Sequence, residues 1–114
     1  QYFAYLLERL AATPDGEGSL LDSTLVLRGS AFGDPNNHDK LDLPVIIAGA
    51  RVKGNRHVVV PRLTPMANLL LAMLHELDVP MESFGDSNGV LAGIVTVVGE
   101  LVIPLPNGSV TRMR

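Results

Sequence analysis

Two short apolar runs constrain the fold of this chain more than any other feature of the sequence. They are Thr24-Leu25-Val26-Leu27 and Pro44-Val45-Ile46-Ile47-Ala48-Gly49, and neither alternates between apolar and polar residues. Runs without alternation are typical of strands covered on both faces, as in parallel sheets. A third strand is predicted at 57–60, at a sheet edge because Pro61 follows it. The sequence therefore predicts an α/β chain with buried, mostly parallel strands.

Two segments have the apolar spacing of amphipathic helices. The first places Phe3, Leu6, Leu7 and Leu10 on one face and is followed by a glycine-rich loop at 14–18. The second carries an apolar stripe made of Met66, Leu69, Leu70, Met73, Leu74 and Leu77. Thr64 as N-cap and Pro65 as first helical residue predict where the second helix starts, and Pro80 marks its end.

After Gly89 the pattern changes to short strand-like runs. Residues 94–98 and 101–103 are separated by Gly99-Glu100, and Asn107-Gly108 precedes a further run at 110–113. Turn pairs of this kind join antiparallel strands. We therefore expect two parts. Residues 1–93 form part of a doubly wound, mostly parallel sheet with its helices, and residues 94–114 form a β-hairpin or meander tail.

The composition excludes several kinds of partner. The chain is 46% hydrophobic and 18% charged, its formal net charge is −3, and it contains no cysteine. The acidic balance and the scarcity of aromatic side chains argue against nucleic acid, and the lack of cysteine excludes a disulfide scaffold or a thiolate metal site. No apolar run approaches the roughly 20 residues of a membrane-spanning helix, and no signal peptide is visible. We expect neither a nucleic-acid nor a membrane partner.

The densest polar cluster, residues 29–40, directly follows the first predicted strand. In open α/β sheets, ligands bind beyond the carboxyl ends of strands, so the position is that of a site. Asp34, Asn36 and His38 lie within five residues, and a carboxylate, an amide and an imidazole suit a hard or borderline divalent cation. The alternative is a solvated loop in which Asp34 and Asn36 make turns.

Other polar residues are weaker candidates. Ser30 and Ser87 both lie near glycines, but neither has the order of a nucleophile elbow or a histidine and acid in a suitable place. His75 is predicted to be a solvated surface residue. His57 opens a predicted strand, and nothing nearby supports a ligand role for it. The sequence therefore offers no catalytic residue.

Several blocks together resemble a known family. They are residues 20–27, Gly29-Ser30, the Asp34-x-Asn36-x-His38 loop, Leu43-Pro44-Val45, Thr64-Pro65-Met66-Ala67-Asn68-Leu69 and Phe84-Gly85-Asp86-Ser87-x-Gly89. The chain resembles, over roughly residues 2–93, an uncharacterised family of exported bacterial proteins from planctomycetes and some proteobacteria. That family is grouped with the alkaline phosphatase/sulfatase superfamily.

The resemblance implies an alkaline-phosphatase-like fold, a periplasmic or secreted parent protein, and a metal-dependent hydrolase of phosphate or sulfate esters. It implies that Asp34 and His38 bind a divalent metal such as Zn, Ca, Mg or Mn, with Asn36 and Ser30 beside these ligands. The nucleophile and the remaining ligands of such enzymes lie far upstream. The chain is thus expected to be the C-terminal portion of a larger protein, inactive by itself, with the rest of its parent chain as partner.

One departure from the family supports a second hypothesis. The family loop has a second histidine two residues after the first, where this chain has Lys40. A protonated lysine is no metal ligand and opposes a nearby cation. The alternative is a non-catalytic structural or binding domain that has lost its metal site. Under either hypothesis we expect the chain in isolation to self-associate or to be only marginally stable, because a sheet covered on one side only leaves an apolar face exposed.

Overall fold

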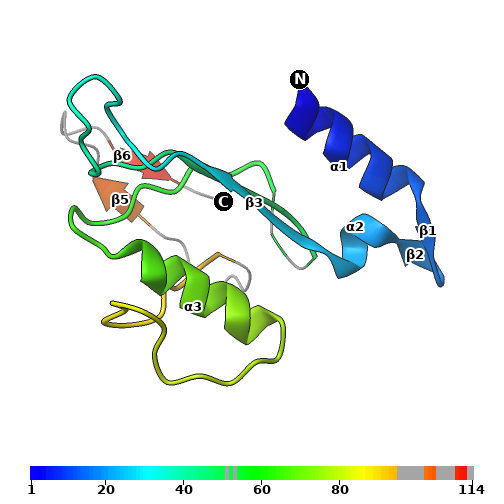
Figure 1. Ribbon diagram of the computed structural model, residues 1–114. Helices are drawn as coiled ribbons and strands as arrows, with labels where there is room; N and C mark the ends of the chain where they lie inside the picture. The colour runs from blue at the N-terminus through cyan, green and yellow to red at the C-terminus, as the bar shows by residue number, and fades with distance from the viewer. Residues whose placement is uncertain (51, 53, 95–101, 105–109, 113–114) are drawn as a thin grey trace. The chain divides into compact units, whose positions relative to one another are not determined.

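The computed structural model describes residues 1–50, 52, 54–94, 102–104 and 110–112 (Figure 1). The chain divides into two compact units, Gln1–Val52 and Lys53–Arg114. The first unit contains α1 (Tyr2–Ala12), β1 (Pro14–Asp15), β2 (Gly18–Ser19), α2 (Leu20–Ser23), β3 (Leu25–Gly29) and β4 (Val45–Gly49). The second contains α3 (Met66–Glu76), β5 (Val102–Pro104) and β6 (Val110–Arg112).

The first helix lies where the apolar spacing predicts it. α1 ends at Ala12, after which Thr13 is extended and its hydroxyl donates to the Arg9 carbonyl at 2.7 Å. The segment after it, predicted as a loop, is a tight antiparallel hairpin of β1 and β2. Gly16 supplies the positive φ of 60° that such a two-residue turn favours.

β3 and β4 pair antiparallel, from Leu25 opposite Gly49 to Gly29 opposite Val45. The prediction of parallel strands is therefore wrong for this pair. A parallel pair needs a crossover, usually a helix, whereas the segment between these strands folds back on itself. The strands are also less buried than predicted: none of their residues is fully buried, and the Ile46 side chain is 51% exposed.

The close approach of β4 to the end of α2 requires a glycine. Gly49 has a φ of 91°, and a Cβ atom at this position would lie 2.1 Å from the Thr24 carbonyl oxygen. Next to it, the Ala50 N–H donates to the Leu21 carbonyl at 2.8 Å. These contacts tie α2 to the end of the β3–β4 ladder.

The described residues form a small α/β chain with helices and three two-stranded antiparallel sheets. No parallel strand pair occurs among them. The prediction of a strand at 57–60 is wrong, because these residues have no regular structure.

In the tail, β5 and β6 pair antiparallel with Val102 opposite Arg112, in agreement with the prediction of a β-rich tail. The predicted turns at 99–100 and 107–108 lie outside the described residues, and the boundary at 93/94 stays a prediction.

α3 begins and ends differently from the prediction. Its N-cap is Pro65 rather than Thr64, whose hydroxyl instead donates to the Pro61 carbonyl at 2.6 Å. At the other end Asp78 takes a φ of 58°, and the Val79 N–H donates to the Leu74 carbonyl at 3.0 Å. This is the pattern of a Schellman motif, which stops the helix before Pro80 is reached.

The buried face of α3 is not the predicted stripe. Within the helix the buried residues are Ala67, Asn68, Leu69, Leu71 and Ala72. Leu71 is 0% exposed, whereas Leu77, the last residue of the predicted stripe, is 52% exposed. When a helix has apolar residues on more than one side, its sequence does not indicate which side is buried. In α3 the buried side includes Asn68, which the segment after the helix contacts.

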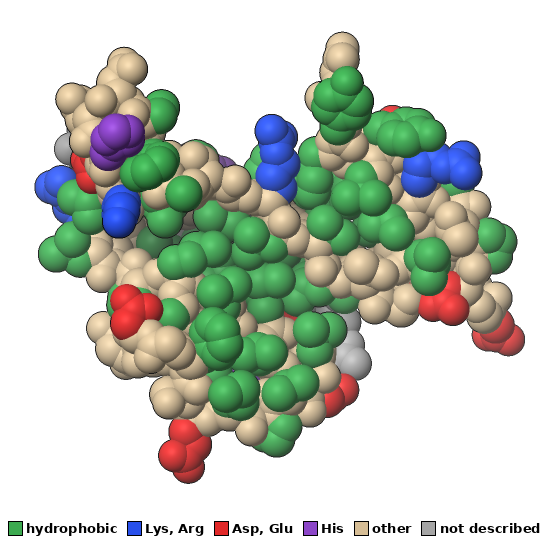
Figure 2. All heavy atoms as spheres, viewed as in Figure 1, with side chains coloured by type: hydrophobic (Ala, Val, Ile, Leu, Met, Phe, Trp, Pro, Cys, Tyr) green, Lys and Arg blue, Asp and Glu red, His purple; other side chains and the backbone are tan. Residues whose placement is uncertain are grey.

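Hydrophobic side chains remain at the surface over both units, as the green areas of Figure 2 show. The large exposed ones are Tyr2, Tyr5, Leu6, Ile46, Val60, Leu63, Leu77, Val79, Met81, Phe84 and Val90. No helix in the described part of the chain is long and apolar enough to cross a membrane.

Leu71 is the largest fully buried side chain in the described residues, so its truncation tests the core of the second unit. We expect Leu71→Ala to destabilise this unit by about 3 kcal/mol, because it leaves a cavity that cannot collapse fully. Urea unfolding followed by the helical circular dichroism signal measures the change. Leu77→Ala is the matched control and should cost less than about 1 kcal/mol, since that side chain already contacts water.

Candidate functional site

The predicted site residues lie in the segment that connects β3 to β4, residues 30–44, here called the β3–β4 loop. An isolated antiparallel bridge joins Asp34 to Asp39. The Gly33 N–H donates to the Asp39 carbonyl at 2.9 Å, and the Asp39 N–H donates to the Asp34 carbonyl at 2.9 Å. Residues 35–38 form the turn at the tip of this small hairpin. Asp34, Asn36 and His38 therefore share one tight backbone feature.

Gly33 is required where the two sides of the loop approach each other. A Cβ atom at Gly33 would lie 1.9 Å from the Leu41 carbonyl oxygen, far inside van der Waals contact. The constraint is a close approach of backbone rather than a positive φ. Any larger residue at this position would separate the two sides and disturb the turn that carries Asp34 and His38.

The Asp34 carboxylate accepts hydrogen bonds from its own loop. The Asn37 Nδ2 donates to one carboxylate oxygen at 2.6 Å, and the Asn36 backbone N–H donates to the other at 2.9 Å. The Asn37 side-chain bond, followed by the Asn36 backbone bond, lowers the pKa of Asp34 below its ordinary value of 3.8. These two hydrogen bonds hold the carboxylate in one orientation and favour its ionised form.

His38 is exposed and has a φ of 51°, in the left-handed region. Its imidazole packs against Phe32, with 5.3 Å between ring centroids and a 45° angle between the planes. Phe32 is in turn held by Ser30, whose hydroxyl donates to the Phe32 carbonyl at 2.7 Å and accepts from the Phe32 N–H at 3.2 Å. Ser30 therefore supports the residue behind His38.

The structure places the predicted site residues on one small hairpin. Their hydrogen bonds, however, are also those expected of a loop that binds no metal. Asp34 makes the turn that the alternative interpretation expects, and it does so through the Asn36 backbone rather than the Asn36 side chain. Lys40 is exposed and follows the bridge residue Asp39. The metal site thus stays a prediction, on a loop whose shape is held by its own hydrogen bonds.

The donor set suits a divalent metal as a partial site. An ionised carboxylate and an exposed imidazole are the ligand types that Zn or Mn takes from proteins. Among the described residues, no group of three or more His, Cys, Asp or Glu side chains could hold a metal ion. Asp34 and His38 would therefore need further ligands from outside the described part of this chain.

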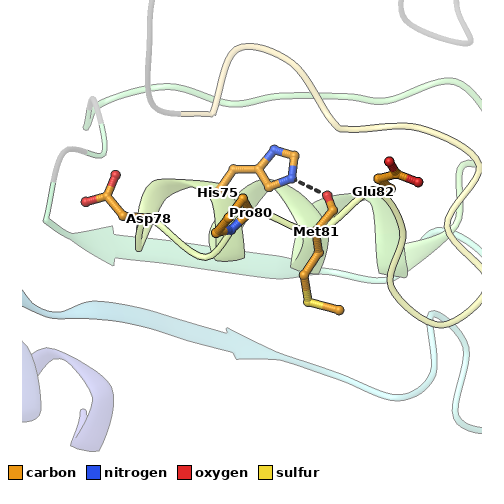
Figure 3. A pocket seen from close by; sticks show the side chains of 5 residues that line it. All are labelled: His75, Asp78, Pro80, Met81 and Glu82. Atoms are coloured by element: carbon orange, nitrogen blue, oxygen red, sulfur yellow. Dashed lines mark hydrogen bonds between the residues drawn. The ribbon is translucent and has the colours of Figure 1, made fainter.

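Within the part of the chain that the structure describes, the remaining polar groups do not form a second site of this kind. His75 is exposed, as predicted, and its Nε2 lies 2.7 Å from the Met81 carbonyl oxygen at a surface hollow (Figure 3). The Asp78 and Glu82 carboxylates line the same hollow but lie on opposite sides of the imidazole and do not converge (Figure 3). The Ser87 hydroxyl accepts from the Phe84 N–H at 2.8 Å and so stabilises a turn.

A buried polar contact on α3 was not predicted from the sequence. Asn68, buried on α3, exchanges two hydrogen bonds with Asn88. The available signal was an amide residue inside the apolar sequence of the second helix, because a buried amide must find partners. Asn88 precedes Gly89, which suggested only a turn.

No family model, no curated protein and no solved structure matches this chain.

The hydrogen bond from Asn37 to Asp34 predicts a shift in acid titration. We expect Asn37→Ala to raise the pKa of the Asp34 carboxyl towards 3.8, because the first cause of its lowering is removed. Because the pKa of Asp34 is lower in the folded loop than in the unfolded chain, the ionised carboxylate stabilises the folded loop at pH values above the unfolded pKa. This stabilisation is lost as the pH falls through the folded pKa. On acidification, the loop of the variant should therefore lose this stabilisation at a higher pH than the loop of the parent sequence. Carbon NMR of the carboxyl group measures both changes.

Asn36→Ala is the matched control for this titration. The Asn36 contact is made by its backbone N–H, so loss of the side chain should leave the pKa of Asp34 as it is in the parent sequence. An equal rise in both variants would show that the side-chain amide of Asn37 is not the cause.

Proposed function

We propose that this chain is the C-terminal part of an exported bacterial, metal-dependent hydrolase of the alkaline phosphatase/sulfatase type. In this proposal the β3–β4 loop contributes Asp34 and His38 to a divalent metal, and the nucleophile and other ligands come from the rest of the parent chain. The observation that supports it best is the Asp34 carboxylate, oriented by two hydrogen bonds, on the same tight turn as an exposed imidazole.

The open edges of the β3–β4 pair support a larger parent sheet. In the described residues each strand pairs with the other, and no third strand joins them. A two-stranded hairpin is marginally stable by itself in water. Antiparallel pairs at the edge of otherwise parallel sheets are common, so an antiparallel β3–β4 pair is compatible with the doubly wound, alkaline-phosphatase-like fold that the resemblance implies. The parent would be periplasmic or secreted.

Each residue of the loop has a definite part in the proposal. When bound, the metal would neutralise charge on a phosphate or sulfate ester and assist the nucleophile. The Asn36 N–H and the Asn37 amide hold the Asp34 carboxylate in its ionised form. Phe32 supports the His38 ring, and Ser30 supports Phe32. Partners that orient a ligand in this way are typical of metal sites.

A non-catalytic structural or binding domain is the second candidate, and two observations favour it. Lys40 places a positive charge in the loop, where it opposes a cation. Donors of the loop already bind both oxygens of Asp34, one hydrogen bond to each. In that case the hairpin is a rigid turn whose polar groups stabilise the chain and bind no metal.

Metal content of the full-length parent protein separates the two candidates. We expect the purified protein to contain a divalent metal. The variants Asp34→Asn and His38→Ala should each bind this metal about tenfold more weakly or worse, because loss of a ligand reduces metal affinity at least as much as loss of a residue that orients the ligand. His57→Ala is the matched control, because His57 is exposed and lies in the other unit. Elemental mass spectrometry and competition with a chelator give the readouts.

The outcomes of the metal experiment differ clearly. Metal that stays equally bound in both loop variants would show that the ligand assignment is wrong. A full-length protein without metal would leave the non-catalytic domain as the function. Lys40→Gln should strengthen binding in the first case, because it removes the opposing charge.

The exposed apolar side chains predict how the chain behaves by itself. Tyr5 and Leu6 on α1 and Ile46 on β4 are 61%, 44% and 51% exposed, and apolar surface of this kind is normally covered by a partner. We propose that the parent chain covers it, and we expect the isolated chain to self-associate or to be only marginally stable at micromolar concentration. Sedimentation velocity measures this, and a monomer with a cooperative melt would contradict it.

A further inference from the structure

Asn68 and Asn88 are joined by two reciprocal hydrogen bonds, here called the Asn68–Asn88 clamp. The Asn68 Nδ2 donates to the Asn88 Oδ1 at 2.9 Å, and the Asn88 backbone N–H donates to the Asn68 Oδ1 at 2.9 Å. Asn68 is 7% exposed, and its backbone carbonyl accepts from the Leu91 N–H at 3.1 Å. A buried helix residue thus holds both the side chain and the backbone of an exposed loop.

The residue after Asn88 makes this amide chemically reactive. In an Asn-Gly pair the glycine nitrogen can attack the asparagine Cγ, because no side chain hinders the approach. Gly89 is exposed and has no atom within 4 Å of where a Cβ would lie. Its N–H donates to no acceptor within the described part of the chain. The nucleophile is therefore accessible.

The reaction balances with water as the single co-reactant. A bond forms between the Gly89 nitrogen and the Asn88 Cγ, the bond from Cγ to Nδ2 breaks, and ammonia leaves with the proton from the glycine nitrogen. Water then opens the resulting succinimide at either carbonyl. One product has aspartate at position 88 and the other has isoaspartate, in which the backbone runs through the former side chain.

We propose that Asn88 is a site of spontaneous deamidation whose rate is set by the Asn68–Asn88 clamp. While the clamp is closed, the Asn88 amide is tied at Oδ1 to the same side chain that binds its own N–H. Ring closure requires rotation about the side-chain bonds of Asn88, and this two-point contact resists that rotation. Deamidation therefore proceeds from the locally opened loop, and its rate follows the population of that state.

The two products affect the loop differently. An aspartate at position 88 keeps an oxygen that accepts from the Asn68 Nδ2 and keeps its own N–H, so the clamp can close again. Isoaspartate lengthens the backbone by one carbon. The clamp and the bond from the Leu91 N–H to the Asn68 carbonyl cannot then form together, and the segment after Ser87 is released from α3. Deamidation acts as an irreversible opening of this loop.

The test compares the rate of mass gain at Asn88 in the chain and in a synthetic peptide of residues 84–92. Samples are kept at mildly alkaline pH and physiological temperature, and peptide mapping follows the gain of one mass unit. We expect the peptide to react fastest. Asn68→Ala should react about tenfold faster than the parent sequence, the factor expected if the two clamp bonds together stabilise the closed loop by about 1.4 kcal/mol.

Two further variants keep the test decisive. Gly89→Ala fits the structure without a clash and should suppress the reaction while amide exchange at Leu91 stays slow. Asn88→Asp should also keep slow exchange at Leu91, whereas isolated isoaspartate product should lose it. If Asn68→Ala unfolds, as circular dichroism would reveal, the comparison of chain with peptide still decides. Equal rates in those two, or an unchanged rate in a folded Asn68→Ala, would overturn the proposal.

Discussion

The antiparallel pairing of β3 with β4 determines where every candidate site residue lies. Five residue pairs align the two strands, and the Ser30 N–H continues the ladder by donating to the Pro44 carbonyl at 3.2 Å. The loop must therefore reverse direction over a short span, which the Asp34–Asp39 bridge accomplishes. Gly33 allows that reversal because its missing side chain leaves room for the Leu41 carbonyl. The positions of Asp34 and His38 follow from this backbone geometry.

The second unit depends on burial rather than on a ladder. α3 supplies most of the buried side chains among the described residues, and Leu71 is the most enclosed of them. The segment after the helix is held by polar contacts as well. Asn68 binds Asn88, and the Arg56 guanidinium donates to the Gly93 and Ile94 carbonyls at 2.8 and 2.6 Å. Because a buried amide without partners is costly, these bonds give the segment one position.

The candidate site could be located from the sequence, but its internal contacts could not. A polar cluster after an apolar strand marked residues 29–40 as the place for a site. The structure puts Asp34 and His38 on one turn there. That Asn37 rather than Asn36 contributes the side-chain bond to Asp34 depends on the direction in which each amide points. Spacing in the sequence contains no information on that direction. The same holds for Phe32 behind His38.

By itself the sequence determined the two long helices, the two central strands and the tail strands near 102 and 110, because each follows from local spacing of apolar residues and turn signals. Only the tertiary structure decided how β3 and β4 pair and which side of α3 is buried. Both depend on contacts between residues distant in the chain. Apolar side chains on several sides of a helix or strand allow more than one partner, and the backbone hydrogen bonds that choose between them have no signature in the residue types.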